Sequence, residues 1–387
     1  MRLITSFTNG EWADLIPDED DEDAGPDYRE QFRDSMTELM RSQNLVVLTG
    51  LGTSLCITDE DGEKLAPTMW DLWTTIREQV TPAVFDEVCE LVRHIQEEND
   101  DGEMEYVEDI ELLLSKCLVR QEYRRSTTVR DFIREAESVI VELCNFLEDE
   151  TSLDTHEAFL RRIARRPTRL PRTKLFTTNY DLAFETAASR IHFITVDGFS
   201  HTLPQEFDSG YFGYDLVRRE EDGAAPNYIP NVFQLIKLHG SIDWQEEGDR
   251  IAKRMSPTKP VLIYPRHSKY ELSYESPFLD LMSRFQQSLR QTETSLLIIG
   301  FGFNDKHLAQ PILSAIRSNV GLRTMVVSPS LEGSDNDSVS TIENLISSGD
   351  SRLSLVAGTF EDFLPYLPDL VSETEDERHR KRLRGDA

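Results

Sequence analysis

The sequence predicts an α/β fold, in which helices cover both faces of a mainly parallel sheet and a helical block is inserted into the chain. Two observations support this fold class. Short apolar runs bounded by turn residues alternate with segments whose apolar residues recur every three to four positions, which is typical of buried parallel strands and their covering helices. In residues 69–165, by contrast, the helical spacing dominates. A chain of 387 residues that is 39% hydrophobic can bury such a core.

Residues 1–40 are predicted to form an acidic N-terminal arm that ends in a helix. Six consecutive acids, from Asp18 to Asp23, repel one another, so this run is expected to stay solvated. Apolar residues at helical spacing then predict an amphipathic helix over 30–40.

The sheet domain is predicted to comprise residues 41–68 and 166–366, with the helical insertion, 69–165, between its two parts. Bounded apolar runs predict strands at 45–48, 174–178, 193–196, 235–239, 261–264, 295–300, 324–328 and 353–357. Helical spacing predicts the main covering helices at 181–190, 278–290 and 306–318. Residues 367–387 pass from acids to bases and are expected to form a charged tail that frays.

The formal net charge of −30 argues against direct binding to nucleic acid or to anionic membranes, because both depend on Lys and Arg side chains. No apolar run approaches the roughly 20 residues of a membrane-spanning helix, and no signal-peptide core precedes Glu11. The four cysteines form no CxxC pair, so neither a zinc site nor a disulfide framework is expected; they are Cys56, Cys89, Cys117 and Cys144. These features predict a cytoplasmic protein without a metal ion.

Four short motifs lie where an open α/β sheet holds its ligands, at the carboxyl ends of strands. The first follows the strand at 45–48 and contains Gly50, Gly52, Thr53 and Ser54. Its glycines would let backbone N–H groups approach a phosphate, and the following helix start would add a favourable dipole. The alternative is an ordinary structural turn.

The second motif contains Asn179 and Asp181, residue types that favour strand-to-helix turns, so a plain helix cap is the alternative to a binding role. The third places His239 at the end of an apolar strand, followed by Gly240 and Ser241. Such a histidine is either a hydrogen-bonded core residue or a base that faces a cleft.

The fourth motif is the glycine turn from Gly300 to Gly302, after which Asn304 or Asp305 would cap the next helix. In this order the motifs resemble the sirtuin-like (Sir2-type) family, and more closely its bacterial antiphage branch than the protein deacylases. Family sequences run GAGxS, (T)xNxD, HG and a later glycine turn. Leu51 stands where the family usually has alanine, and the deacylases' four-cysteine zinc module and Pro-Asp-Phe-Arg loop are absent from this sequence.

The resemblance implies a Rossmann-like sheet that binds NAD as a substrate. The turn at Gly50 would hold the pyrophosphate, whereas the turn at Gly300 and the region of Ser328 would line the adenosine side. The NAD-binding residues that the resemblance implies are Gly50, Gly52, Thr53, Ser54, Gly300, Gly302 and Ser328.

Three catalytic residues are implied in the same way. Asn179 would orient the nicotinamide ribose or a water molecule, and Asp181 would shape the nicotinamide pocket. His239 would contact the ribose hydroxyls and act as general base, since a histidine with a pKa near the working pH suits proton transfer.

Without a zinc module or an acyl-lysine loop, water is the expected acceptor, so the resemblance implies hydrolysis of NAD to nicotinamide and ADP-ribose. It further implies a role in antiphage defence by abortive infection, with a homo-oligomer and a HerA-type hexameric ATPase as partners. The alternatives are an NAD or ADP-ribose sensor without turnover and an NAD-dependent protein deacylase. Residues Glu108 to Glu111 resemble an acidic helix start of defence-associated relatives, although an acid-rich first turn also complements the helix dipole.

Overall fold

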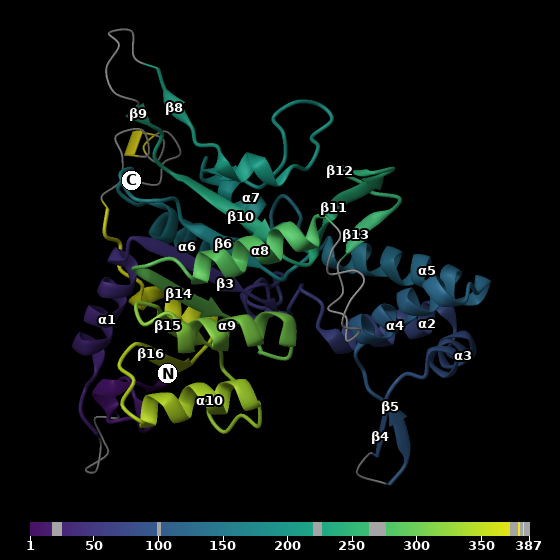
Figure 1. Ribbon diagram of the computed structural model, residues 1–387, viewed down its shortest axis with the longest axis horizontal. Coiled ribbons are helices and arrows are strands. Elements are labelled where there is room, and N and C mark those ends of the chain that lie inside the picture. Colours follow the sequence, from purple (N-terminus) through teal and green to yellow (C-terminus); the bar gives the residue numbers. More distant parts are fainter. Residues whose placement is uncertain are drawn as a thin grey trace.

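The structure, a computed structural model, describes residues 1–17, 25–98, 102–219, 227–262, 276–371, 378–379 and 382. The acidic run from Asp18 to Asp23 therefore lies outside the described residues, as does most of the predicted tail. A 9-stranded sheet forms the centre of the molecule, in the order β2-β1-β16-β15-β14-β3-β6-β10-β7 (Figure 1). Its strands are β1 (Arg2–Ile4), β2 (Ala13–Asp14), β3 (Asn44–Thr49), β6 (Lys174–Thr177), β7 (Ile194–Val196), β10 (Val232–Lys237), β14 (Thr294–Ile299), β15 (Arg323–Val327) and β16 (Leu353–Ala357).

The strands from β16 to β7 all run parallel, and only the edge pairings of β1 are antiparallel. The prediction of an α/β fold with a mainly parallel sheet is confirmed. The strand β1, which lies between the edge strand β2 and β16, was not predicted, because three residues are too few to show a period. It pairs with β16 through Leu3 and Val356, so the beginning of the predicted arm belongs to the sheet.

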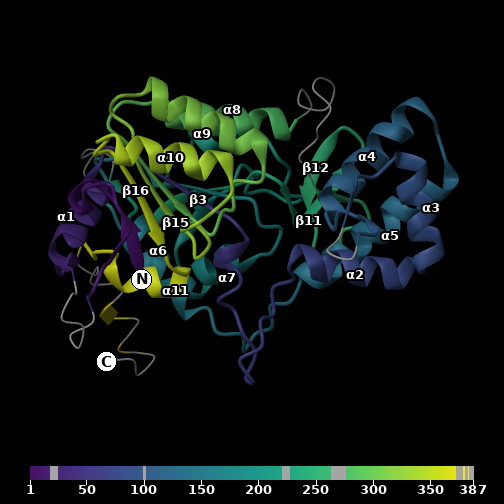
Figure 2. The ribbon, with the colours of Figure 1, turned by 90° about the horizontal axis from the view of Figure 1, so that it is seen from below.

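Helices cover both faces of the sheet, as predicted (Figure 2). Successive residues of β3 point to opposite faces, so Val46 packs in one core layer and Val47 in the other. The first layer includes α8 (Phe278–Leu289), α9 (Lys306–Ser318) and α10 (Asp337–Ser347). The second includes α1 (Arg29–Arg41), α6 (Asp154–Ala164), α7 (Ala183–Arg190) and α11 (Phe360–Phe363).

A helical lobe projects from the sheet and has a core of its own (Figure 1, right). It comprises α2 (Met69–Val80), α3 (Pro82–Val92), α4 (Ile110–Tyr123) and α5 (Thr127–Cys144), with an unpredicted hairpin of β4 (Gln96–Glu98) and β5 (Met104–Tyr106). Helix α6 was assigned to this block from the sequence, but Phe159 on α6 packs beneath the sheet against Phe184 on α7. The sheet domain completes the lobe core with Tyr180 and Ile242.

The run at 261–264 was predicted as a strand of the parallel sheet, and this is wrong. Its described residues lie in β13 (Pro260–Leu262), which joins β11 (Gly240–Glu247) and β12 (Arg250–Lys253) in a separate antiparallel sheet. Leu238 and His239 form a turn between β10 and β11, so His239 lies in a turn rather than at the end of a strand. Gly240 permits this path because its φ is 83° and a side chain there would meet the Val261 carbonyl.

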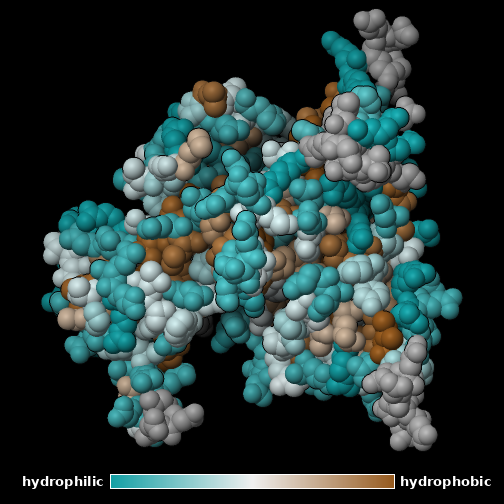
Figure 3. Space-filling view, turned by 180° about the vertical axis from the view of Figure 1, so that it is seen from behind, coloured by the Kyte–Doolittle hydropathy of each residue, from teal (hydrophilic) through white to brown (hydrophobic). Residues whose placement is uncertain are grey.

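Two small strands, β8 (Val217–Arg218) and β9 (Asn227–Tyr228), form a further hairpin beside the sheet. From behind, the surface is mostly hydrophilic with scattered apolar patches, and a notch separates the lower part of the lobe from the sheet domain (Figure 3). None of the helices in the described ranges has the length and apolarity that a bilayer crossing requires.

Candidate functional site

A cavity of about 240 Å³ lies at the carboxyl ends of β3, β6 and β14, where the lobe meets the sheet domain. This is the edge at which parallel α/β sheets bind ligands. Six of the residues singled out from the sequence line this cavity: Gly50, Asn179, Asp181, His239, Gly300 and Gly302. Four others lie outside its lining: Gly52, Thr53, Ser54 and Ser328.

The two glycine turns pack directly against each other. The Gly52 amide donates a hydrogen bond of 3.0 Å to the Gly300 carbonyl. A Cβ atom on Gly52 would lie 2.6 Å from the Gly300 Cα, and Gly300 itself has a φ of 64°. A Cβ atom on Gly50 would lie 2.7 Å from the Gly300 oxygen. Close backbone contact thus requires these glycines whether or not a phosphate binds.

Asn179 joins the second motif to the first. Its Nδ2 atom donates hydrogen bonds to the Gly50 carbonyl at 3.1 Å and to Ser54 Oγ at 2.7 Å, and it lies 3.3 Å from Thr53 Oγ1. Asp181 accepts a bond of 2.7 Å from the Ser54 hydroxyl and one of 2.9 Å from the Ala183 amide at the start of α7. Thr53 and Ser54 therefore support the lining residues from behind.

His239 faces a carboxylate that the sequence identified only as a helix cap. Its Nε2 atom lies 3.1 Å from Asp305 Oδ2, while Asp305 Oδ1 accepts the His307 amide at the start of α9. Burial disfavours the protonated imidazole, but the bond to Asp305 and the charge of Glu111 outweigh burial and raise the pKa of His239. Burial also opposes ionisation of Asp305, yet the His239 bond lowers the pKa of Asp305 overall.

The lobe contributes Glu111, in the first turn of α4, to the cavity lining. Glu111 Oε1 accepts a hydrogen bond of 2.7 Å from the Tyr180 hydroxyl. Burial of the carboxylate raises the pKa of Glu111, against the opposing effects of His239 and Tyr180. The capping role in this acidic segment falls to Asp109, which accepts the Leu112 amide at 2.8 Å.

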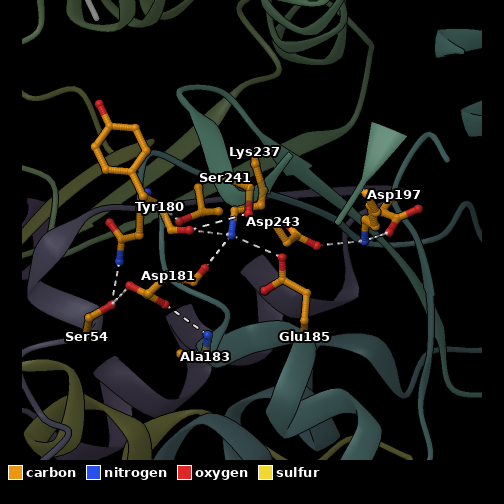
Figure 4. A network of polar contacts seen from close by, with 12 residues as sticks. Ser54, Tyr180, Asp181, Ala183, Glu185, Asp197, Lys237, Ser241 and Asp243 are labelled. Carbon is orange, nitrogen blue, oxygen red and sulfur yellow. Dashed lines mark hydrogen bonds and ion pairs between the residues drawn. The ribbon is translucent and has the colours of Figure 1, made fainter. Parts of the chain in front are cut away.

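Lys237 anchors the turn that carries Tyr180 and Asp181 (Figure 4). It is 3% exposed, and its Nζ atom donates to the carbonyls of Tyr180 and Asp181 and pairs with Glu185 at 3.1 Å. A buried charge of this kind requires such partners. The sequence pattern gave no sign of this role, because Lys237 occurs within an apolar strand run.

Ser328 lies buried at the end of β15, 3.4 Å from the Ser330 hydroxyl, and is not part of the cavity wall. Cys144 does line the cavity, and burial raises its pKa, so its thiol stays protonated. Within the described part of the chain, no group of three or more His, Cys, Asp or Glu side chains is arranged to hold a metal ion.

Residues 173–344 match the family model of the SIR2-like domain. The match runs from β6 into α10 and so includes Asn179, His239 and Gly300, whereas Gly50 and the helical lobe lie outside it. No curated protein matches the chain. SIR2-like domains bind NAD and often use it in catalysis. The match and the mostly parallel sheet together support a Sir2-type family, with an NAD-related function, for this chain.

Proposed function

We propose that the chain hydrolyses NAD to nicotinamide and ADP-ribose. The observation that supports this most strongly is the meeting of Asn179, His239, Asp305 and Glu111, from separate elements, at one cavity. Its volume of about 240 Å³ is small for a ligand pocket, so it suits the nicotinamide ribose rather than the whole dinucleotide.

The reaction breaks the bond between the nicotinamide nitrogen and the ribose C1′ carbon, and the bonding electrons leave with nicotinamide. The ribose carries positive charge as this bond lengthens, and the carboxylate of Glu111 would stabilise that charge. Water then bonds to C1′, and neutral His239 takes up the proton that is released. Asp305 would hold the ring of His239 in place through its hydrogen bond. The balance is NAD⁺ and water to nicotinamide, ADP-ribose and a proton.

The absence of the four-cysteine zinc module of the deacylases supports water as the acceptor. The four cysteines are far apart in the sequence, and each is a free thiol in the structure. The zinc-binding cysteine module of the deacylases is therefore missing. We propose hydrolysis in place of acyl transfer on this basis.

The biological role follows from the resemblance of the motifs to those of antiphage proteins. We propose that NAD depletion arrests infected cells, and that assembly restrains the enzyme until infection. A homo-oligomer and a HerA-type ATPase are the proposed partners, with the helical lobe as the contact surface. Comparing NAD cleavage by the chain alone and with such an ATPase tests this: equal rates under all conditions would exclude the ATPase as regulator.

Chromatography of the products from purified protein and NAD tests the reaction itself. Equal amounts of nicotinamide and ADP-ribose are expected. Asn179→Ala and His239→Ala should each reduce their release by about 100-fold or more while the circular dichroism spectrum stays unchanged. NAD binding without products would instead favour a sensor, and full turnover by both folded variants would exclude this site.

A further inference from the structure

A second cavity, of about 570 Å³, lies in the lobe between the end of α3 and the side of α4. Four of the described residues that line it are basic, and none of those described lining residues is acidic; the basic ones are Arg93, Lys116, Arg120 and Arg124. In a chain with a net charge of −30, such a concentration of positive charge is unusual. We call this cavity the α4 groove.

Among the described residues, the basic groups of the α4 groove lack the carboxylate partners that would normally balance them. The Nε atom of Arg120 is buried and has no hydrogen-bond partner in the same part of the chain. Lys116 donates its hydrogen bond of 2.9 Å to the Arg93 carbonyl, and burial lowers the pKa of Lys116. A bound anion would offset the repulsion between these cations.

The spacing of the cations indicates the shape of the ligand. Lys116 and Arg120 lie four residues apart, so they share one face of α4 at about 6 Å along its axis, and Arg124 follows directly after the last residue of the helix. Three cations within this short length suit two or three linked phosphates. Apolar side chains of Leu91 and Val119 line the remainder, as does the ring of Tyr123, which is 75% exposed. These surfaces suit a nucleoside, since aromatic rings stack on bases.

We propose that the α4 groove binds a nucleotide with two or three phosphates, at a site separate from the cavity that contains His239. The volume of the groove lies within the usual range for small-molecule sites. Arginine and lysine are the side chains that recognise phosphate, through charge-assisted hydrogen bonds.

The same helix connects the two cavities. The first turn of α4 carries Glu111 in the first cavity, and residues from Leu112 onward line the α4 groove. A nucleotide held by Lys116 and Arg120 therefore acts on the helix that delivers a carboxylate to His239. This coupling rests on the proposed NAD cleavage, whereas the binding site itself does not.

Calorimetric titration of the full chain with ATP, and separately with inorganic tripolyphosphate, tests the site. Both should bind, ATP more tightly because of its base, and the double variant K116A/R120A should weaken ATP binding at least tenfold. The matched control is Arg134→Ala, which removes an exposed arginine of α5 outside the groove and should bind as wild type does. Asn179→Ala should also retain ATP binding.

Three results would overturn the proposal. They are the absence of ATP binding at millimolar concentration, equal binding by K116A/R120A and wild type, and loss of binding in Asn179→Ala alone. Capture of a glutamate-rich peptide in place of ATP would assign the groove to an acidic protein segment. The coupling is measured as a several-fold change in NAD cleavage on adding ATP, absent from K116A/R120A. An unchanged rate with intact ATP binding would overturn the coupling alone.

Discussion

His239 and Asp305 are hydrogen-bonded to each other in the wall of the cavity, with 3.1 Å between Nε2 and Oδ2. Asp305 also caps α9 through the His307 amide, so one carboxylate both begins a helix and holds the imidazole. Asp305, which follows the Gly300–Gly302 turn, thereby holds the imidazole ring of His239 in place. This arrangement links the protonation of His239 to the position of α9.

The pH dependence of NAD cleavage should report this pair. A base must be neutral to accept a proton, and the pKa of His239 is raised, so the acid limb of kcat/KM should lie above the value of about 6.5 for free histidine. Asp305→Asn keeps a helix cap but removes the charge, which should move the limb to lower pH and reduce the plateau rate. The rate of nicotinamide release, measured over a range of pH for wild type and variant, gives the acid limb and the plateau of kcat/KM. If the acid limb lies at the same pH in both proteins, Asp305 does not set the pKa of His239.

Glu111→Gln should lower NAD cleavage by about tenfold or more, because a neutral amide stabilises the cationic ribose less than a carboxylate does. The variant can still accept the Tyr180 hydrogen bond, so the lobe should stay in place. Tyr180→Phe is the matched control: it removes that hydrogen bond and keeps the charge, and should have the smaller effect. If Tyr180→Phe instead reduces the single-turnover rate more than Glu111→Gln does, Glu111 acts only through its hydrogen bond with Tyr180.

Gly300→Ala should destabilise the fold by roughly 1–3 kcal/mol, as a Cβ atom would lie 2.6 Å from the Gly52 Cα. Two causes contribute to this loss: the steric clash of the new Cβ atom and the strain of a positive φ at a residue with a side chain. The variant Gly333→Ala separates them. Gly333 also has a positive φ, of 69°, but a Cβ atom added there would have no described atom within 4 Å, so this variant should show backbone strain alone. Urea denaturation measures both free energies of unfolding. If the two variants lose the same free energy of unfolding, the contact between the turns at Gly52 and Gly300 does not add to the strain.

Lys237→Met should cost roughly 3–5 kcal/mol of stability, because it removes a buried cation and leaves the half-buried Glu185 carboxylate without its partner. Adding Glu185→Gln should recover part of this loss, since the second change removes the unpaired charge. Chemical denaturation of the two single variants and the double variant gives the coupling energy. Strict additivity would show that the pair does not contribute as a unit.

His156 should make the protein less stable in mild acid. Its ring is buried against Phe184 and Phe360, with neither nitrogen hydrogen-bonded to a described residue, and burial lowers its pKa to about 4. The unfolded chain takes up a proton near pH 6.5 and the native state does not, so stability falls as the pH drops from 6.5 towards 4.

His156→Phe should remove this loss, which amounts to about 2 kcal/mol at pH 5. Thermal unfolding of wild type and variant at pH 8 and at pH 5 provides the comparison. The variant should gain in Tm relative to wild type only at the lower pH. A difference that is the same at both pH values would show that packing, and not protonation, distinguishes them.

The sequence by itself determined the parallel strands from β16 to β7 and their main covering helices, but not the antiparallel strands β1 and β2. Strands that are buried on both faces are mostly apolar, and this pattern predicted β16 with the bounds that the structure has. The helical spacing of apolar residues predicted the bounds of α9 in the same way. The meeting of Asn179 and Gly300 at one edge could be predicted as well, because the carboxyl ends of parallel strands share an edge. Local periodicity carries this information.

Only the tertiary structure decided which charged groups meet in the site. His239 and Asp305 are 66 residues apart, and Tyr180 and Glu111 are 69 apart. Nothing in the period of a strand or helix selects such partners, because the choice depends on how the lobe and α9 pack against the sheet. The glycines show the same division. Their positions predict turns, but the contact between Gly52 and Gly300 exists only once β3 and β14 lie side by side.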